Sequence, residues 1–155
     1  MQKKSVVRSA ARLFFLLFLV NTIGYIGGSY MTPETMAWYK TLPNAPLTPP
    51  DWVFPIVWTI LFFLMAVSAF LVWGKASPRW FVGQLMMNML WSFCFFYLKN
   101  PIMALGVLIL MLVFLGLNIA SFGRFSKVAG WLLVPTFIWG LFALYLNGYI
   151  VFNII

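Results

Sequence analysis

Charged residues divide the chain into five long apolar stretches. The stretches cover residues 13–32, 52–74, 80–98, 101–123 and 128–155, and the predicted span in the last of them is 128–152. About 20 apolar residues in a helix cross the hydrocarbon core of a bilayer, and a helix satisfies its own backbone hydrogen bonds there. None of the stretches alternates with the period of two that a membrane β-strand shows. The pattern predicts an all-α, integral membrane bundle of five transmembrane helices, in a single domain covering residues 1–155.

The first stretch has a second interpretation, as a cleavable signal peptide. Basic residues precede it, and Gly27-Gly28-Ser29 resembles a cleavage site. Residues 13–32, however, have the full length of a membrane span. The length favours a helix that stays in the protein.

The connection between the first two stretches, residues 33–51, is the longest and is rich in proline. Its prolines are Pro33, Pro43, Pro46, Pro49 and Pro50. Proline fixes φ and reduces the entropy that a loop loses on ordering. We therefore expect a lid loop of defined shape; the alternative is a stiff connector with no part in binding.

Basic residues are distributed unevenly between the two ends of the predicted spans. Eight of the ten Lys and Arg lie on the side of the amino terminus, whereas Lys40 and Lys99 lie on the other side with both acids, Glu34 and Asp51. Because basic loops remain in the cytoplasm, we expect a multi-pass protein of the bacterial plasma (inner) membrane, with a cytoplasmic amino terminus and an external carboxy terminus. The net charge of +8 is then explained by topology and contact with anionic lipid, not by nucleic acid.

The composition excludes several kinds of chemistry. Of the 155 residues, 64% are hydrophobic and 8% are charged, with no His and one Cys, Cys94. A Cys/His metal site therefore lacks ligands, a His-based catalytic triad lacks its base, and a disulfide lacks a second thiol. No predicted span contains the carboxylate that a proton-coupled exporter uses.

Three of the eight tryptophans, Trp58, Trp91 and Trp139, lie inside predicted spans rather than at the membrane interfaces where Trp is common. Each shares a helix face with aromatic or amide residues. The rows are Phe54, Trp58 and Phe62; Gln84, Asn88, Trp91, Ser92 and Phe95; and Pro135, Trp139, Ala143 and Asn147. If the rows face inward, they line an aromatic small-molecule pocket with a few amides. The alternative is ordinary helix packing, with the amides as interhelical hydrogen bonds.

Several of these segments resemble the tryptophan-rich sensory protein/translocator protein family (TspO/MBR). Trp38-Tyr39 and the segment Thr48–Thr59, TPPDWVFPIVWT, are similar to the family signature WY…TPPxWVFxxVWT. Gln84-Leu85, Asn88, Trp91 and Phe95-Phe96 resemble the family's third-helix pattern. Leu132-Leu133, Pro135, Trp139, Phe142-Ala143 and Leu146-Asn147 resemble its fifth.

The resemblance implies a five-helix bundle, usually a homodimer, whose first loop closes over a ligand pocket. The implied ligands are tetrapyrroles, such as protoporphyrin IX or haem, and other hydrophobic small molecules. The implied ligand-binding residues are Tyr39, Pro49, Phe54, Trp58, Phe62, Asn88, Trp91, Phe95, Trp139 and Ala143. Two departures concern the lid and sterols: Asn44-Ala45-Pro46-Leu47 stands where relatives commonly have Lys-Pro-x-Trp, and no basic residue follows Lys127 to complete a sterol-recognition pattern.

The sequence leaves more than one function open. We expect a membrane receptor or sensor that requires no cofactor and binds a porphyrin as its ligand, with Lys40 or Lys99 available to its carboxylates. A second interpretation is an enzyme that degrades porphyrin with light and oxygen, in which Trp58 and Trp139 would be the catalytic residues implied by the resemblance. A third is a passive transporter of porphyrin or lipid. No metal site is predicted.

Overall fold

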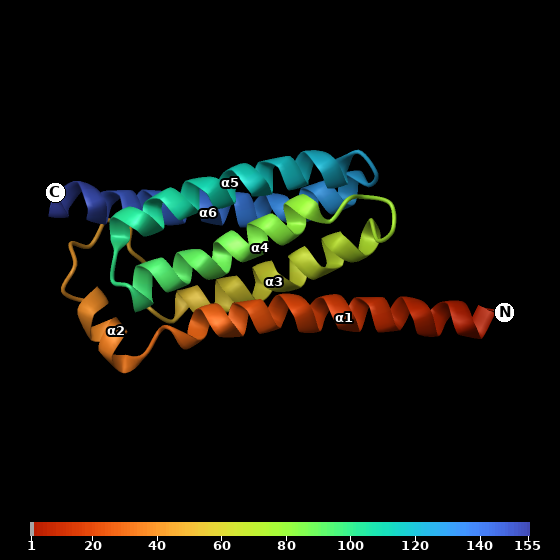
Figure 1. Ribbon diagram of the computed structural model, residues 1–155, viewed down its shortest axis with the longest axis horizontal. Helices are drawn as coiled ribbons and strands as arrows, with labels where there is room; N and C mark the ends of the chain where they lie inside the picture. Colours follow the sequence, from red (N-terminus) through yellow and green to blue (C-terminus); the bar gives the residue numbers. More distant parts are fainter. Residues whose placement is uncertain (1) are drawn as a thin grey trace.

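A computed structural model describes the backbone of residues 2–155 and the side chains from Val6 onward, so the side chains of Lys3 and Lys4 lie outside the described part. The described chain is mostly helical, with turns and loops between the helices, and the described residues contain no strand (Figure 1). Its elements are α1 Gln2–Ser29, α2 Pro33–Tyr39, α3 Val53–Leu71, α4 Arg79–Ser92, η1 Phe93–Tyr97, α5 Pro101–Gly123 and α6 Lys127–Ile154. The all-helical fold predicted from the sequence is therefore confirmed.

Local sequence explains where several helices begin. Thr32, Asn100 and Ser126 each accept a backbone N–H through the side chain at the start of α2, α5 and α6. Such caps satisfy donors that the first helical turn leaves free. Pro33 and Pro101 follow the first two caps, at a position where the missing N–H costs nothing. After α3 the chain turns at Gly74, whose φ of 73° favours glycine.

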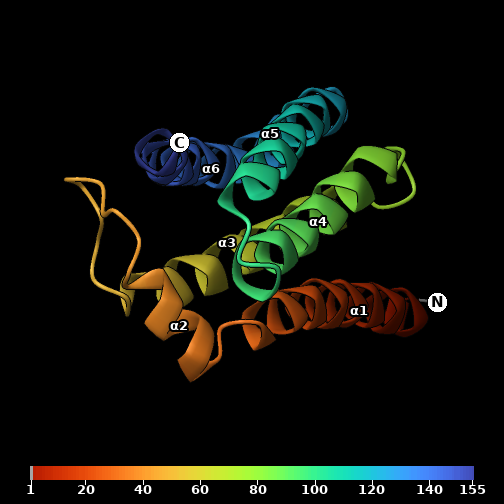
Figure 2. The same cartoon turned by 60° about the vertical axis from the view of Figure 1, so that its left-hand side comes forward.

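The five long helical segments form a closed ring. α1 packs against α3 and α4, α3 packs against α6, and α5 packs against both α6 and α4 (Figures 1 and 2). α3 and α4 thus face each other across the interior, where Gln84 Nε2 lies 3.4 Å from Met65 Sδ. α2 lies across one end of the ring, against η1. We call this end, which holds α2 and the carboxy terminus, the lid end, and the opposite end, which holds the amino terminus, the basal end.

Four helices are long and apolar enough to cross a membrane. Their candidate spans are Val6–Ser29, Val53–Leu71, Pro101–Gly123 and Lys127–Ile154. The expected span 80–98 is different, because it is divided between the 14 residues of α4 and the five-residue π-helix η1. The other expected spans agree with helices to within a few residues, apart from α1, which begins well before residue 13.

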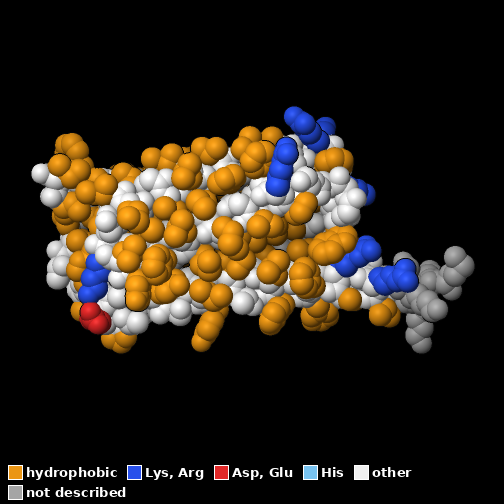
Figure 3. Space-filling model, in the orientation of Figure 1, with side chains coloured by type: hydrophobic (Ala, Val, Ile, Leu, Met, Phe, Trp, Pro, Cys, Tyr) orange, Lys and Arg blue, Asp and Glu red, His pale blue; other side chains and the backbone are white. Residues whose placement is uncertain are grey.

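On the face shown in Figure 3, the side of the bundle is covered by apolar side chains and the charged side chains lie toward its two ends. Phe14, Phe18, Tyr25 and Trp131 are each more than 70% exposed. Side chains of this kind are stable on a surface only when it contacts lipid or another protein. The chain is a membrane protein with several apolar helices.

Candidate ligand-binding site

Two connected hollows, both partly open to the surface, lie at the lid end of the ring. The small chamber has a volume of about 90 Å³, and the large chamber has a volume of about 700 Å³. Six residues line both chambers: Met31, Met36, Asp51, Phe54, Pro55 and Trp91. Because they share these walls, we treat the two chambers as one site. The large chamber falls within the 300–1,000 Å³ that is usual for small-molecule sites.

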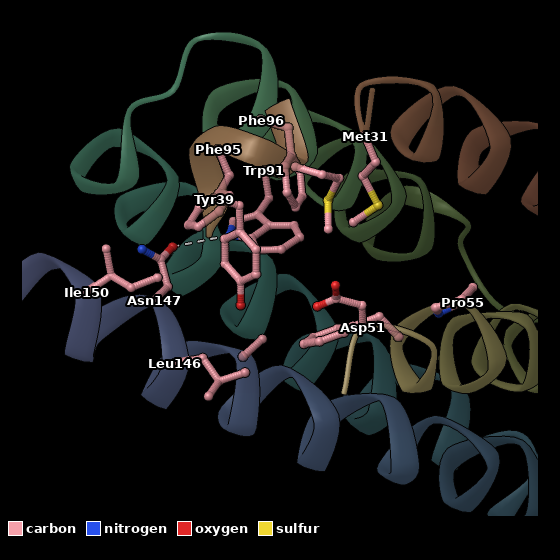
Figure 4. Close-up of a pocket in the computed structure, with 13 residues that line it drawn as sticks. Met31, Tyr39, Asp51, Pro55, Trp91, Phe95, Phe96, Leu146, Asn147 and Ile150 are labelled. Atoms are coloured by element: carbon pink, nitrogen blue, oxygen red, sulfur yellow. Dashed lines mark hydrogen bonds between the residues drawn. The ribbon is translucent and has the colours of Figure 1, made fainter. Parts of the chain in front are cut away.

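Aromatic rings from α2, α4 and η1 form one wall of the small chamber (Figure 4). Trp91 stacks on Phe95 with ring centroids 5.5 Å apart and planes at 28°. Tyr39, from α2, meets the edge of Phe95 at 6.0 Å and lies 6.3 Å from Phe96. Ala143 and Asn147 of α6 form the facing wall. The lid and the bundle therefore contribute to the same apolar surface.

η1 brings Phe95 and Phe96 to this wall together. In a regular α-helix, consecutive side chains point about 100° apart, whereas a π-turn inserts one residue and shifts the side chains that follow it. Phe95 and Phe96 are both almost fully buried and both line the small chamber. The residues that the sequence predicted on one face of this span included Phe95 but not Phe96, because that prediction assumed an uninterrupted α-helix.

Asn147 holds the indole of Trp91 in place. Trp91 Nε1–H donates to Asn147 Oδ1 at 3.3 Å, and Asn147 Nδ2 donates to the carbonyl oxygen of Pro101 at 3.0 Å (Figure 4). Asn147 is 2% exposed, so both ends of its amide are satisfied inside the protein. The hydrogen bonds connect α4, α6 and the start of α5, and they orient the ring that both chambers share.

Glycines of α1 allow side chains of α3 and α4 to pack closely against this helix beside the large chamber. A Cβ at Gly24 would lie 2.3 Å from the ring of Phe62, and a Cβ at Gly27 would lie 3.2 Å from Ser92 Oγ. The Phe62 ring therefore occupies the space that a larger residue in α1 would take. Trp58 lies beside it with ring centroids 5.5 Å apart, and Asn88 lines the same chamber.

The charged groups of the lid end form two ion pairs. Lys99 Nζ lies 2.8 Å from Glu34 Oε1, and Lys40 Nζ lies 3.7 Å from Asp51 Oδ2. The hydrogen bond from Lys99 and its positive charge lower the pKa of Glu34. Burial, and then the charge of Asp51, raise the pKa of Tyr39, so its hydroxyl stays neutral. Neither lysine lines the two chambers, where Asp51 is the one charged residue among those described.

Most of the residues expected at the site line one or both chambers. They are Tyr39, Phe54, Trp58, Phe62, Asn88, Trp91, Phe95 and Ala143. Pro49 instead lines a separate hollow of about 460 Å³ in the lid, beside Tyr39 and Lys40. Trp139 lines neither chamber; its ring meets the edge of Phe54 at 5.9 Å, so it supports the wall from behind.

Sequence reasoning missed three residues near the lid that line the site. Met31 and Met36 line both chambers, but neither belongs to an aromatic row that could have indicated it. The expected lid loop 33–51 also contains the short helix α2, which places Met36 and Tyr39 one turn apart on the same side. Asp51 was recognised as an acid near the lid, but nothing in its spacing showed that it lines the site.

The described residues offer few ligands for a metal ion. No group of three or more His, Cys, Asp or Glu side chains comes together in the described part of the chain. The thioethers of Met31 and Met36 are donors of a kind that iron accepts in some haem proteins, whereas Tyr39 would first have to lose its proton, which its raised pKa opposes. The site can thus surround a flat apolar molecule, whereas a tightly held ion would find little coordination.

Comparisons with known proteins identify the family of the chain. The model of the TspO/MBR family matches residues 15–152. The "Tryptophan-rich protein TspO" of Chlorobaculum tepidum is 39% identical over 138 residues, covering 83% of this chain and 87% of that protein. The protein of the same name in Archaeoglobus fulgidus is 33% identical over 142 residues, covering 88% and 92%. The "Translocator protein" of Ovis aries is 29% identical over 133 residues, covering 80% and 79%. The chain belongs to the TspO/MBR family.

Proposed function

We propose that this protein is a membrane receptor that binds a flat hydrophobic ligand, with a tetrapyrrole such as protoporphyrin IX as the leading candidate, in the two chambers beneath α2. The observation that carries the proposal is the aromatic wall of Trp91, Phe95 and Tyr39, built from both the lid and the bundle. Aromatic contacts of this kind contribute about 0.5–1.5 kcal/mol each beyond the burial of area. Because Tyr39 is inclined at 61° to Phe95, a porphyrin packed against this wall would meet one ring face to face and another edge-on, and both kinds of contact supply useful affinity.

The proposal includes five membrane crossings. α4 and η1 follow each other without a break from Arg79 to Tyr97, and a chain of that length spans most of a bilayer. The segment packs between α1 and α5, both of which are long enough to cross. With five crossings the basal end faces the cytoplasm of a bacterial plasma membrane, because it carries the excess of Lys and Arg. The lid then faces outward.

The charges of the site suggest how a porphyrin would be oriented. Asp51 lines both chambers and repels carboxylates, so the propionate groups would point toward the rim of the lid. Lys40 and Lys99 lie there, each already in an ion pair. The ring system would then be the part that enters the apolar interior. A homodimer belongs to the same proposal, since the resemblance implies one.

The direct test is a titration of the detergent-purified protein with protoporphyrin IX in the dark, in which binding is measured by the quenching of tryptophan fluorescence. Trp91→Leu should weaken binding at least tenfold, because it removes the ring that both chambers share. Trp131→Leu is the matched control: Trp131 is 72% exposed and lines neither chamber. Equal affinity in the two variants would contradict the proposed site.

Illumination separates receptor from enzyme in the same cuvette. A receptor holds the porphyrin, so its absorbance should decay no faster with protein than with an equal amount of denatured protein. Protein-dependent loss of absorbance would support photo-oxidative degradation instead. Trp58, which lines the large chamber, would then be one of two indoles beside the ligand, together with Trp91. Trp139, behind Phe54, would act only through that ring.

A further inference from the structure

A second hollow lies at the basal end of the ring, away from the ligand chambers. We call it the basal pocket; its volume is about 300 Å³. Its floor is apolar and buried, and consists of Leu16 of α1, Ala69 and Val72 at the end of α3, Phe81 of α4 and Phe122 of α5. Its rim is formed by exposed residues of the α3–α4 turn, Trp73, Gly74 and Pro78. The pocket therefore connects the apolar interior of the ring with the surface of the basal end.

Cations lie beside the rim, although none of them lines the pocket itself. The guanidinium of Arg12 lies 5.9 Å from the centroid of the Trp73 ring, and that of Arg79 lies 4.5 Å from the centroid of Trp80. Lys75 lies in the turn between two lining residues, Gly74 and Ala76. Stacking on an indole holds a guanidinium in place but leaves its N–H donors at the edge of the plane available.

These cations have no acid to pair with. The whole chain contains two acidic side chains, Glu34 and Asp51, and both are in ion pairs at the lid end. The space-filling view shows the resulting separation, with blue side chains gathered at the basal end and red ones at the lid end (Figure 3). An uncompensated positive rim around an apolar pocket favours a ligand with one anionic group and an apolar chain.

We propose that the basal pocket binds an anionic phospholipid from the leaflet that the basal end faces. Arg12 and Arg79 contact its phosphate, and the end of one acyl chain packs against Phe81 and Phe122. Arginine matches phosphate because its donors are planar and paired, and basic pockets between membrane helices are typical sites for anionic lipid headgroups. A zwitterionic lipid carries an ammonium group that finds no carboxylate at this end, so the site should prefer the anionic lipid.

Native mass spectrometry of the full chain, exchanged into detergent with phosphatidylglycerol or with phosphatidylcholine of the same acyl chains, tests the proposal. The wild type should retain one phosphatidylglycerol with at least fivefold higher occupancy than phosphatidylcholine. The double variant Arg12→Gln/Arg79→Gln should lose that preference. Arg124→Gln/Lys127→Gln is the matched control, because it removes the same charge from the same end. Arg12 stacks on the lining residue Trp73 and Arg79 directly follows the lining residue Pro78, whereas Arg124 and Lys127 neither stack on a lining residue nor stand next to one in the chain.

The outcomes are distinct. Equal losses in the two double variants would show diffuse attraction to the basic end and would overturn the proposal, as would equal occupancy by the two lipids. Competition by soluble glycerol phosphate alone would also overturn it, because the apolar floor would then contribute nothing. Ala69→Leu, which fills the floor without changing charge, should reduce occupancy too. Each variant should first elute as a monodisperse species and melt cooperatively in detergent, and protoporphyrin binding at the other end is not needed for any readout.

Discussion

At the scale of single residues, substitution of Asn147 removes two hydrogen bonds inside the bundle. It accepts from the Trp91 indole and donates to the Pro101 carbonyl, and it is buried. Asn147→Leu leaves the Trp91 indole N–H without its acceptor, at a cost of roughly 1–3 kcal/mol for a buried group, and removes the side-chain donor from the Pro101 carbonyl at the start of α5. We expect a lower melting temperature and weaker binding of protoporphyrin, since the Trp91 ring loses its fixed orientation.

Asn153→Leu on the same helix is the control for that prediction. Asn153 is exposed, and its Nδ2 donates only to the carbonyl of Tyr149 one turn earlier. Its substitution should change thermal stability and ligand affinity little. If both variants behave alike in a melting curve and a dark titration, Asn147 does not position the indole.

The positions of Trp139 and Ala143 show what spacing cannot determine. Trp139 and Ala143 are four residues apart and were expected on one face, yet Ala143 lines the small chamber and Trp139 packs behind Phe54. Four residues of helix rotate by about 40° beyond a full turn, and a ring as large as indole follows the space that its neighbours leave. Aromatic rows predicted which helices contribute, whereas the direction of each ring depended on tertiary packing.

At the scale of helices, the approach of α1 to α3 depends on one glycine. A Cβ at Gly24 would lie 2.3 Å from Phe62, whereas a Cβ at Gly28, one turn later, would meet nothing within 4 Å. Gly24→Ala should therefore push the Phe62 ring or α1 itself, lower the melting temperature and reduce binding in the large chamber. Overpacking of this kind typically costs about 1–3 kcal/mol.

Gly28→Ala on the same face provides the comparison. Alanine favours helix over glycine by roughly 0.5–1 kcal/mol, so this variant should be as stable as the wild type or more so. Thermal unfolding of both variants in one detergent measures the difference. A similar loss of stability in Gly28→Ala would contradict the prediction, because it would mean that the close packing of α1 against α3 is not specific to Gly24.

The lid helix α2 is fastened to the bundle by an ion pair that responds to acid. Lys99 lowers the pKa of Glu34, so the pair stabilises the closed lid above pH 4.5 and its contribution is lost as the pH falls through the lowered value. Glu34→Gln should increase the dissociation rate of a bound porphyrin by less than about fivefold at neutral pH, since exposed pairs are weak. Stopped-flow measurements of porphyrin dissociation at neutral pH and at pH 4 test this prediction. The dissociation rates of wild type and variant should differ at neutral pH and should become more similar at pH 4. A constant ratio at both values would exclude the ion pair as the cause.

Much of the element-level structure was predictable, and the exception has a physical reason. Apolar length and the positions of charge indicated where α1, α3, α5 and α6 run, because those patterns reflect transfer into lipid. The π-helix η1 was not predictable, since Phe93–Tyr97 reads as an ordinary apolar segment. We attribute its irregular turn to the packing of Phe95 and Phe96 against α5, which follows it, and against α2, which is distant in sequence.

At the scale of the whole molecule, the ring has two ends of different character. The lid end pairs its few charges and encloses aromatic chambers, and the basal end carries unpaired cations around an apolar pocket. The separation of charge was visible in the sequence. The order of helices around the ring was not, because every span is apolar on most of its faces and helix packing in lipid depends on shape.

The orientation of these ends in the membrane can be measured with single cysteines. Cys94 is buried, so it can be replaced by Ser to give a background without thiols. Asn44 in the lid and Ser77 in the α3–α4 turn are both exposed and lie at opposite ends. In intact bacterial cells, a membrane-impermeant maleimide should label Asn44→Cys but not Ser77→Cys, and permeabilisation should make both react. Because the distribution of Lys and Arg assigns the basal end to the cytoplasm, labelling of Ser77→Cys alone in intact cells would reverse the orientation. The chambers would then receive their ligand from inside the cell.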